Sequence, residues 1–190
     1  MIERKEYLEK LKKWKDKDLI KVVTGIRRCG KSTLFELYID YLKEIGIEDN
    51  HIISINLENP DNEFENYKEL YKYVKDQIKD KKQYYIFLDE IQNVAEFQKA
   101  VDGLYILKNV DVYITGSNAY LLSGELATLL TGRYIEIKMY PLSFKEYANY
   151  YGKEADERVY LNYINRSSFP YALKLEDESE IDDYLDALYN

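Results

Sequence analysis

Several residue types are scarce in this 190-residue chain, which has one cysteine, one histidine, one tryptophan and three prolines. A single cysteine excludes an internal disulfide and fits a reducing compartment. The lone histidine, His51, has no metal-binding companion in the sequence, so we expect it to be structural or solvated. The sequence also lacks the Ser/His/Asp set and the GxSxG motif of nucleophilic hydrolases.

Long apolar segments are also absent. No run approaches the roughly 20 residues that a membrane-spanning helix needs. The N-terminal stretch "MIERKEYLEK" is charged from the start and lacks the apolar core of a signal peptide. We therefore expect a cytoplasmic protein without a membrane partner.

The composition that is present is globular, with 46% hydrophobic and 33% charged residues. The 21 tyrosines are spread over the chain, which favours a compositional bias over an aromatic binding surface. The net charge of -8 is uneven, because residues 1–31 hold 11 basic and 5 acidic side chains whereas residues 151–190 hold 4 and 10. This acidity disfavours nucleic acid as a partner, and the basic N-terminal segment keeps it open.

Hydrophobic patterns predict alternating strands and helices. Buried or alternating apolar runs predict strands in "DLIKVVTG" (18–25), "HIISINLE" (51–58), "YYIFLDE" (84–90), "VDVYITGSN" (110–118) and "RYIEIKMY" (133–140). Helical spacing predicts helices at 2–14, 31–46, 65–82 and 94–107, and a capping box of Ser143 and Glu146 begins another. Strands that alternate with helices imply an α/β fold, a mostly parallel sheet of about five strands with helices on both faces.

Two regions follow from this pattern. Residues 1–152 form the predicted core, including the N-terminal helix 2–14. Residues 153–190 form an acidic helical segment without strands, the start of a lid or of a C-terminal region.

A phosphate-binding loop is the strongest motif. "GIRRCGKS" (25–32) satisfies G-x-x-x-x-G-K-[ST], the Walker A motif, and lies between a predicted buried strand and a predicted helix. Backbone amides of such a loop surround phosphates, the lysine reaches the β- and γ-phosphates, and the serine hydroxyl ligates Mg²⁺. The residues assigned to the nucleotide are Gly25, Ile26, Arg27, Arg28, Cys29, Gly30, Lys31, Ser32 and Thr33.

Three of these loop residues have an open alternative. The motif does not require Arg27 or Arg28. Three roles are open for these two arginines: contact with the phosphates, contact with a partner, or exposure to solvent. Cys29 fills space beside the phosphates and has no catalytic role in this interpretation.

An acid pair ends the third predicted strand, as a Walker B motif does. Asp89 and Glu90 follow four apolar residues, and ligands of open parallel sheets bind at the carboxyl ends of the strands. Asp89 therefore suits Mg²⁺, and Glu90 suits polarisation of the attacking water. The alternative is an acid pair that caps a helix. Gln92 is a further candidate, for orienting water or coupling to a partner.

The fourth strand ends in polar residues that can sense the γ-phosphate. Ser117 and Asn118 are the preferred candidates ahead of Thr115, and a glycine turn that starts the next helix is the alternative. Arg133, just before the fifth strand, either reaches the γ-phosphate of a neighbouring subunit or forms an internal ion pair.

These motifs together resemble the ATPase domain of prokaryotic AAA+-type P-loop ATPases, over roughly residues 15–150. The resemblance rests on "IKVVTGIRRCGKSTL", "YIFLDEIQNV", "DVYITGSNAYLLSGELATLLTGRY" and "YPLSFKEY", in that order. It implies a RecA/AAA+-like sheet with an additional strand, ATP as the nucleotide and Glu90 as the catalytic acid. It also implies sensor function near Ser117 and Asn118 and an arginine finger at Arg133.

The family resemblance also implies a C-terminal domain, and a Gly-Gly-aromatic-Pro segment before it. This sequence has serines in place of those glycines in "NRSSFPYAL" (165–173) and stops at Asn190. We therefore expect either a piece of a longer protein or an abbreviated one.

Three functions compete at this point. The leading one is an ATPase that couples binding and hydrolysis of Mg²⁺-ATP to conformational change, in a homo-oligomer or with a protein partner of unidentified class. The second is a nucleotide-gated interaction module with little turnover. The third is a P-loop kinase, which the glutamate directly after the Mg²⁺ aspartate disfavours.

Overall fold

The structure is a computed structural model of the chain that describes residues 2–116 and 130–189. The chain forms two compact units. The sheet unit comprises residues 5–25 and 31–139, and the helical unit comprises residues 1–4, 26–30 and 140–190.

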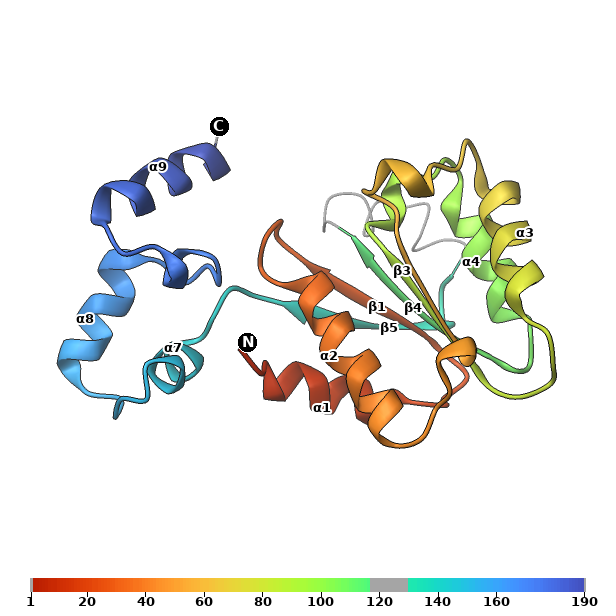
Figure 1. Ribbon diagram of the computed structural model, residues 1–190, viewed down its shortest axis with the longest axis horizontal. Coiled ribbons are helices and arrows are strands. Elements are labelled where there is room, and N and C mark those ends of the chain that lie inside the picture. Colours follow the sequence, from red (N-terminus) through yellow and green to blue (C-terminus); the bar gives the residue numbers. More distant parts are fainter. Residues whose placement is uncertain (1, 117–129, 190) are drawn as a thin grey trace. The chain divides into compact units, whose positions relative to one another are not determined.

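The sheet unit contains the predicted alternation of strands and helices (Figure 1). Its elements are α1 (Lys5–Trp14), β1 (Ile20–Gly25), α2 (Lys31–Glu44), η1 (Asp49–His51), β2 (Ile52–Asn56), η2 (Pro60–Asn62), α3 (Tyr67–Gln77), β3 (Tyr84–Asp89), η3 (Ile91–Asn93), α4 (Phe97–Tyr105), β4 (Val110–Gly116) and β5 (Tyr134–Met139).

The five strands form one parallel sheet in the order β2-β3-β4-β1-β5. Strand β4 lies between β1 and β3, with Val22 opposite Ile114 on one side and Leu88 opposite Ile114 on the other. This confirms the predicted α/β P-loop fold and its additional strand. Because all strands run in the same direction, the residues that follow β1, β3 and β4 emerge at one edge of the sheet.

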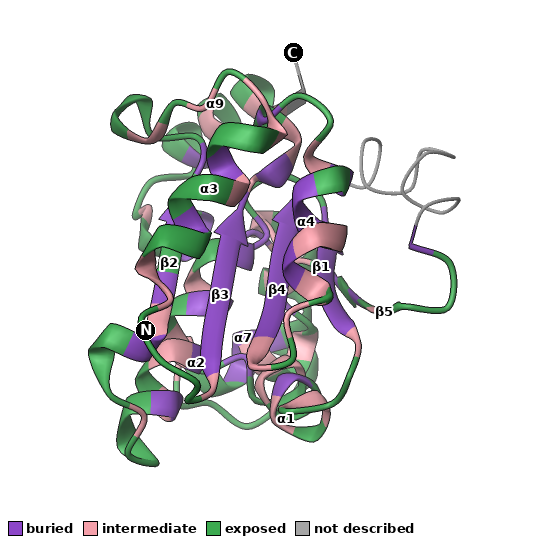
Figure 2. Ribbon diagram, turned by 90° about the vertical axis from the view of Figure 1, so that its right-hand side faces the viewer, coloured by how far each residue is buried: buried purple, intermediate pink, exposed green. Residues whose placement is uncertain are grey.

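The two faces of the sheet are covered by different helices. Helices α1 and α2 contact each other and α2 contacts β1, whereas α3 and α4 contact each other and α4 contacts β4. Strands β1 and β3 are buried along their whole length, as Figure 2 shows. Continuous apolar strands are typical of a parallel sheet that is covered on both sides.

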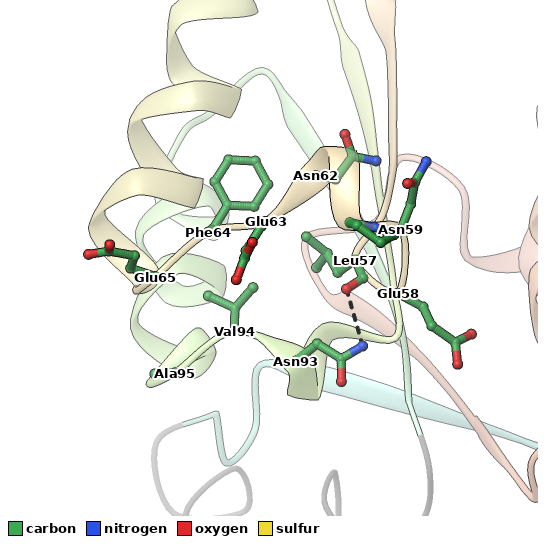
Figure 3. A pocket seen from close by; sticks show the side chains of 11 residues that line it. Leu57, Glu58, Asn59, Asn62, Glu63, Phe64, Glu65, Asn93, Val94 and Ala95 are labelled. Carbon is green, nitrogen blue, oxygen red and sulfur yellow. Dashed lines mark hydrogen bonds between the residues drawn. The ribbon is translucent and has the colours of Figure 1, made fainter.

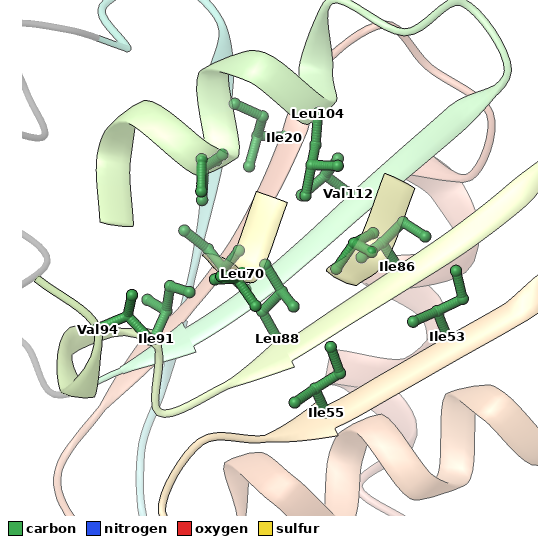
Figure 4. Close-up of a cluster of buried hydrophobic side chains, with 14 of the residues drawn as sticks. Ile20, Ile53, Ile55, Leu70, Ile86, Leu88, Ile91, Val94, Leu104 and Val112 are labelled. Carbon is green, nitrogen blue, oxygen red and sulfur yellow. The ribbon is translucent and has the colours of Figure 1, made fainter. Parts of the chain in front are cut away.

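The face under α3 and α4 is aliphatic. Alternate residues of the strands pack against the two helices there (Figure 4), including Ile20, Ile55, Ile86, Leu88 and Val112 with Leu70 and Leu104. Full burial of each such side chain contributes about 1.5–3 kcal/mol, so this layer holds the sheet and the two helices together.

The face under α2 is aromatic. The ring of Phe87 stacks on Tyr113 with centroids 4.7 Å apart and meets Phe35 edge-on at 5.1 Å. Tyr38 completes the group at 5.2 Å from Tyr113. Four of the chain's many aromatic residues therefore form a core layer.

Helix α2 begins directly after the phosphate loop and ends at Glu44, two residues before the predicted end at Gly46. Gly46 has a φ of 91°, which a side chain would oppose, and its amide donates to the carbonyl of Lys43 at 2.9 Å. The amide of Ile47 reaches the carbonyl of Leu42 at 3.0 Å, which completes a C-terminal cap.

All four helices predicted for the sheet unit are shorter than the sequence pattern indicates, and α1 and α3 show the physical reason. Helix α1 begins at Lys5 rather than Ile2, because Arg4 has a φ of 42° and its guanidinium binds the carbonyl of Cys29 and the carboxylate of Glu146. Helix α3 ends at Gln77, and the extended residue Ile78 packs against the aliphatic core. Tertiary contacts thus override helical periodicity at both ends.

The helical unit contains α7 (Phe144–Tyr150), α8 (Glu157–Arg166), η4 (Ala172–Lys174) and α9 (Glu178–Tyr189). The capping box at the start of α7 is present, with the amide of Glu146 donating to Ser143 Oγ at 3.3 Å. Leu142, Tyr147, Val159 and Leu173 form a small core here. This unit takes in residues 140–190, whereas the sequence pattern divides the chain after residue 152.

Within the described ranges, no helix is both long enough and apolar enough to cross a membrane.

Candidate active site

The loop between β1 and α2 turns through left-handed backbone. The amide of Cys29 donates to the carbonyl of Ile26 at 3.4 Å, and Arg28 and Gly30 have φ values of 64° and 99°. Glycine adopts such a conformation without a Cβ penalty, which explains the second glycine of the motif. The backbone therefore bends sharply just before the helix.

Helix α2 begins at Lys31, the lysine of the motif. No acidic side chain lies in its first turn, so its amides and its positive dipole end face no negative charge from the helix itself. Lys31 is 4% exposed, Ser32 is exposed and Thr33 is half-buried. A helix N-terminus with a buried lysine is a ready site for phosphate.

Arg28 and Cys29 of the loop have partners within the helical unit, to which residues 26–30 belong. The guanidinium of Arg28 lies 5.7 Å from the ring centroid of Tyr184. Cys29 is fully buried, and its carbonyl accepts a hydrogen bond from Arg4 Nη1 at 3.0 Å. Arg27 is exposed. The structure therefore gives Arg28 a stacking contact that the sequence did not indicate.

The acid pair lies where β3 ends. Asp89 is the last residue of the strand and is 6% exposed. Thr115 of β4 donates its hydroxyl to Asp89 Oδ1 and accepts the amide of Glu90 at 3.0 Å. One buried hydroxyl thus fixes both acidic residues, one through its side chain and the other through its backbone.

Glu90 has a strained backbone and a well-contacted carboxylate. Its φ of 52° places it in the left-handed region, which costs a non-glycine residue about 1–3 kcal/mol. Its Oε1 lies 3.3 Å from Lys31 Nζ, and its Oε2 accepts a hydrogen bond from Gln92 Nε2 at 2.7 Å. The structure therefore brings the lysine of the loop and the glutamate of the acid pair together.

The oxygen groups at this edge fit Mg²⁺. The described residues contain no group of three or more His, Cys, Asp and Glu side chains that could hold a metal without other ligands. Mg²⁺ commonly takes only one or two protein oxygens, with phosphate and water completing its shell. Ser32 and Asp89 could supply those oxygens.

The remaining predicted residues divide into two groups. Ser117 and Asn118 lie outside the described residues. Arg133 pairs with Asp102 Oδ1 and lies 5.9 Å from the ring centroid of Tyr105, all within the sheet unit. The internal ion pair that the sequence left open for Arg133 is therefore present.

A cavity of about 450 Å³ lies between the segment that follows β2, residues 57–65, and residues 93–95 at the end of η3 (Figure 3). Asn93 Nδ2 donates to the carbonyl of Leu57 at 3.2 Å across its wall, and the amide of Leu57 donates to the carbonyl of Asp89 at 3.0 Å. These bonds tie the segment after β2 to the segment that carries the acid pair.

Thr115 is more central to this site than the sequence indicated, and one charged cluster was missed. The sequence pattern favoured Ser117 and Asn118 over Thr115 as γ-phosphate sensors. A hydroxyl residue inside an apolar strand next to the strand of the acid pair was nevertheless a usable signal for Thr115. The missed cluster is the buried ion pair of Lys21 and Asp111. Each of these charged residues lies within an apolar strand sequence, and that position was a signal for a buried pair. His51 is structural, with Nε2 at 3.2 Å from Asp80 Oδ2 and its ring against Tyr84.

Comparison with known protein families identifies the family of this chain. A family model described as an AAA domain matches residues 17–148. The chain belongs to the AAA domain family. This match begins before β1, ends within α7, and includes the loop, the acid pair and Thr115.

Two relatives of this AAA domain are longer proteins. An uncharacterized protein of Haemophilus influenzae is 43% identical over 93% of this chain and 46% of its own length. The uncharacterized protein MJ1544 of Methanocaldococcus jannaschii is 32% identical over 90% of this chain and 41% of its own length. The chain therefore spans less than half the length of these two relatives.

Solved structures share the fold. The Walker-type ATPase PABY2304 of Pyrococcus abyssi superposes with a TM-score of 0.56 at 16% identity, covering 97% of this chain and 71% of its own. The ORC1 protein of Aeropyrum pernix, solved in complex with DNA, gives 0.55 at 12% identity over 78% of this chain and 48% of its own. The chain thus has an AAA+-type P-loop ATPase fold, and its family supports an ATPase-like function.

Proposed function

We propose that this AAA domain binds Mg²⁺-ATP and hydrolyses it, and that hydrolysis is coupled to a conformational change. The observation that carries the proposal is the contact of Lys31 Nζ with Glu90 Oε1 at 3.3 Å, one residue from Asp89. A phosphate-loop lysine beside a carboxylate suited to water activation is the arrangement expected when loop and acid pair serve one site.

The residues take distinct roles in this proposal. The amides at the start of α2, with Lys31, hold the β- and γ-phosphates, and residues 25–33 form the nucleotide loop. Ser32 and Asp89 hold Mg²⁺, which when bound neutralises phosphate charge. Glu90 polarises the attacking water.

The proposal also covers the oligomeric state, the partners and the cellular compartment. We propose a cytoplasmic protein that acts as a homo-oligomer or with a protein partner. Ser117 or Asn118 senses the γ-phosphate, and Arg133 acts across a subunit boundary after leaving Asp102. DNA is a weaker candidate for the partner. The basic N-terminal segment and the fold shared with the DNA-bound ORC1 protein of A. pernix support it, and the net charge of -8 opposes it.

Two variants test the ATPase proposal. Lys31→Ala should abolish ATP binding, because the phosphates lose their main cation. Glu90→Gln should keep ATP binding and lower turnover by about 10²–10⁴-fold, the usual contribution of a general base. Binding is measured by calorimetry and turnover by phosphate release, across a series of protein concentrations, with and without DNA.

The outcomes separate the competing functions. Unchanged ATP affinity in Lys31→Ala would eliminate the proposed site. Equal and substantial turnover in wild type and Glu90→Gln would remove the role of Glu90. ATP binding with negligible turnover in both would favour the nucleotide-gated module.

A further inference from the structure

Gln92 lies on a short rigid segment beside the acid pair. It is the middle residue of η3, and the preceding residue, Ile91, is fully buried in the aliphatic core. The amide of Val94 donates to the carbonyl of Ile91 at 3.1 Å, and Asn93 binds the carbonyl of Leu57 (Figure 3). The backbone below Gln92 is therefore held from both sides.

The side chain of Gln92 contacts the carboxylate of Glu90. Its Nε2 donates to Glu90 Oε2 at 2.7 Å, a short charge-assisted hydrogen bond. Lys31 Nζ faces the other oxygen, Oε1, at 3.3 Å. Each carboxylate oxygen of Glu90 thus has its own donor, and this fixes the plane of the carboxylate.

The orientation of Gln92 has a cost elsewhere. Its Oε1 is buried and has no hydrogen-bond partner among the residues that the structure describes. A half-turn of the amide would expose its nitrogen to that position but would place the carbonyl oxygen against the carboxylate of Glu90. The contact with Glu90 therefore determines the orientation, although a buried acceptor remains unsatisfied.

A second cost lies at the same place, because Glu90 has a left-handed backbone. Strained backbone and unsatisfied buried groups persist where function requires them, and both occur here within three residues. An apolar side chain at position 92 would remove the unsatisfied oxygen and, with it, the hydrogen bond to Glu90.

We propose that Gln92 is a positioning residue that holds the carboxylate of Glu90 in the geometry for activating water, an inference that rests on the proposed ATPase function. Gln92 itself does not touch the nucleotide in this scheme. It acts through Glu90, so its loss should reduce turnover and leave nucleotide affinity unchanged.

The test compares three variants. Gln92→Leu removes the donor and the unsatisfied oxygen together, Gln92→Glu places a second carboxylate against Glu90, and Gln77→Leu removes a glutamine amide from the last turn of α3. The control is matched because Gln77 Nε2 donates to a backbone carbonyl of its own helix, that of Tyr73 at 3.4 Å, and Gln77 precedes the amino end of β3.

The expected result is a split between stability and turnover. Gln92→Leu should have a Tm close to that of wild type, because the lost hydrogen bond and the removed unsatisfied oxygen offset each other. Its kcat should be lower by about 10- to 100-fold, and its KM should stay within about twofold. Gln92→Glu should have a lower kcat than Gln92→Leu. Gln77→Leu should match wild type in kcat. In nucleotide-free crystals of Gln92→Leu, the carboxylate of Glu90 should leave the orientation that it has here.

Other results would overturn the inference. A Gln92→Leu kcat within twofold of wild type, or an unmoved Glu90 carboxylate in its crystals, would mean that Gln92 does not position Glu90. A fall in Tm that accompanies the fall in kcat would indicate a structural role only. A wild type without turnover contradicts the ATPase proposal itself and this inference with it. An active Glu90→Gln removes the role of Glu90 and this inference, but leaves ATP hydrolysis in place. An active wild type with an inactive Glu90→Gln and an unaffected Gln92→Leu contradicts this inference alone.

Discussion

Two lysines of the sheet unit each face a carboxylate, and their surroundings differ. Lys21 of β1 pairs with Asp111 of β4 in the aromatic layer, with side chains 0% and 3% exposed. Lys31 pairs with Glu90 at the carboxyl edge of the sheet, with side chains 3% and 17% exposed. Both pairs consist of one lysine and one carboxylate within the sheet unit. Differences in their effect on stability should therefore come from their surroundings.

The pair of Lys21 and Asp111 has a complete set of partners. Lys21 Nζ also donates to the carbonyl of Lys17 at 2.8 Å. Asp111 Oδ2 accepts from the hydroxyl of Tyr113 at 2.7 Å and from the amide of Asp16 at 2.9 Å. Neither Lys21 nor Asp111 has a strained backbone or an unsatisfied side-chain atom, and of their partners only Asp16 has a positive φ, of 57°.

Burial still penalises both charges of that pair. Desolvation lowers the pKa of Lys21 and raises the pKa of Asp111, against the opposing effect of their mutual attraction. The pair at the carboxyl edge instead keeps some solvent access, a left-handed glutamate and a neighbouring unsatisfied acceptor. The ion pair with every group satisfied therefore lies in the interior of the sheet, whereas the incompletely satisfied one lies where chemistry is proposed.

The largest effect should come from breaking the buried pair. Lys21→Met or Asp111→Leu alone leaves an uncompensated buried charge and should lower the free energy of unfolding by about 3–5 kcal/mol, as measured by urea denaturation. The double variant Lys21→Met/Asp111→Leu should recover most of that loss. Lys31→Met should cost less, because Glu90 keeps Gln92 as a donor. Equal losses at the two sites would erase the difference between them.

A smaller effect should follow removal of the bridging hydroxyl. Thr115→Val leaves the amide of Glu90 without its acceptor and should cost about 1–3 kcal/mol of stability, with a fall in ATP turnover. Thr24→Val is the matched control, since it removes a hydroxyl of β1 that donates to the exposed Glu136. Normal turnover in Thr115→Val would separate Thr115 from the active site.

The pH dependence of stability should distinguish the buried pair further. Because the folded-state pKa of Asp111 lies above its ordinary value of 3.8, the native state binds its proton more tightly than the unfolded state does. The contribution of Asp111 is therefore fully favourable below that value and is lost as the pH rises through the folded-state pKa. Wild type should gain stability relative to Lys21→Met/Asp111→Leu as the pH falls from neutral, in denaturation at a series of pH values.

At the alkaline end the lysine acts in the opposite direction. The folded-state pKa of Lys21 lies below 10.5, so wild type should again gain on the double variant as the pH rises toward that value. A difference between the two proteins that does not change with pH would mean that burial does not control this pair.

The smallest effect should be at Arg133. Its pair with Asp102 is exposed, with side chains 47% and 34% accessible, so Arg133→Ala should change stability by less than about 1 kcal/mol. Asp102→Asn should change it by a similar amount. If Arg133 acts across a subunit boundary, only Arg133→Ala should lower turnover, and only at protein concentrations where the chain assembles. A loss of turnover in a proven monomer would contradict that role.

Much of this arrangement was readable from the sequence. Apolar runs ending in polar residues predicted β1, β3 and β4, and the motif predicted that Lys31 and the acid pair lie at one edge. What the sequence did not provide was pairing across strands. Lys21 and Asp111 are far apart in the chain, and only the order β3-β4-β1 makes them neighbours.

Side-chain geometry was likewise beyond the sequence. The pattern could not show that Glu90 has a left-handed backbone or that Thr115 contacts both acids, since each depends on a register set by the whole sheet. Helix ends failed for the same reason, because Arg4 and Ile78 follow tertiary contacts rather than periodicity.

The most direct test is a crystal structure of the chain with Mg²⁺ and a non-hydrolysable ATP analogue. We predict β- and γ-phosphates against Lys31 and the amides that begin α2, Mg²⁺ between Ser32 and Asp89, and the carboxylate of Glu90 facing the γ-phosphate. A nucleotide bound elsewhere, or bound with Asp89 and Glu90 turned away from it, would contradict the proposed active site.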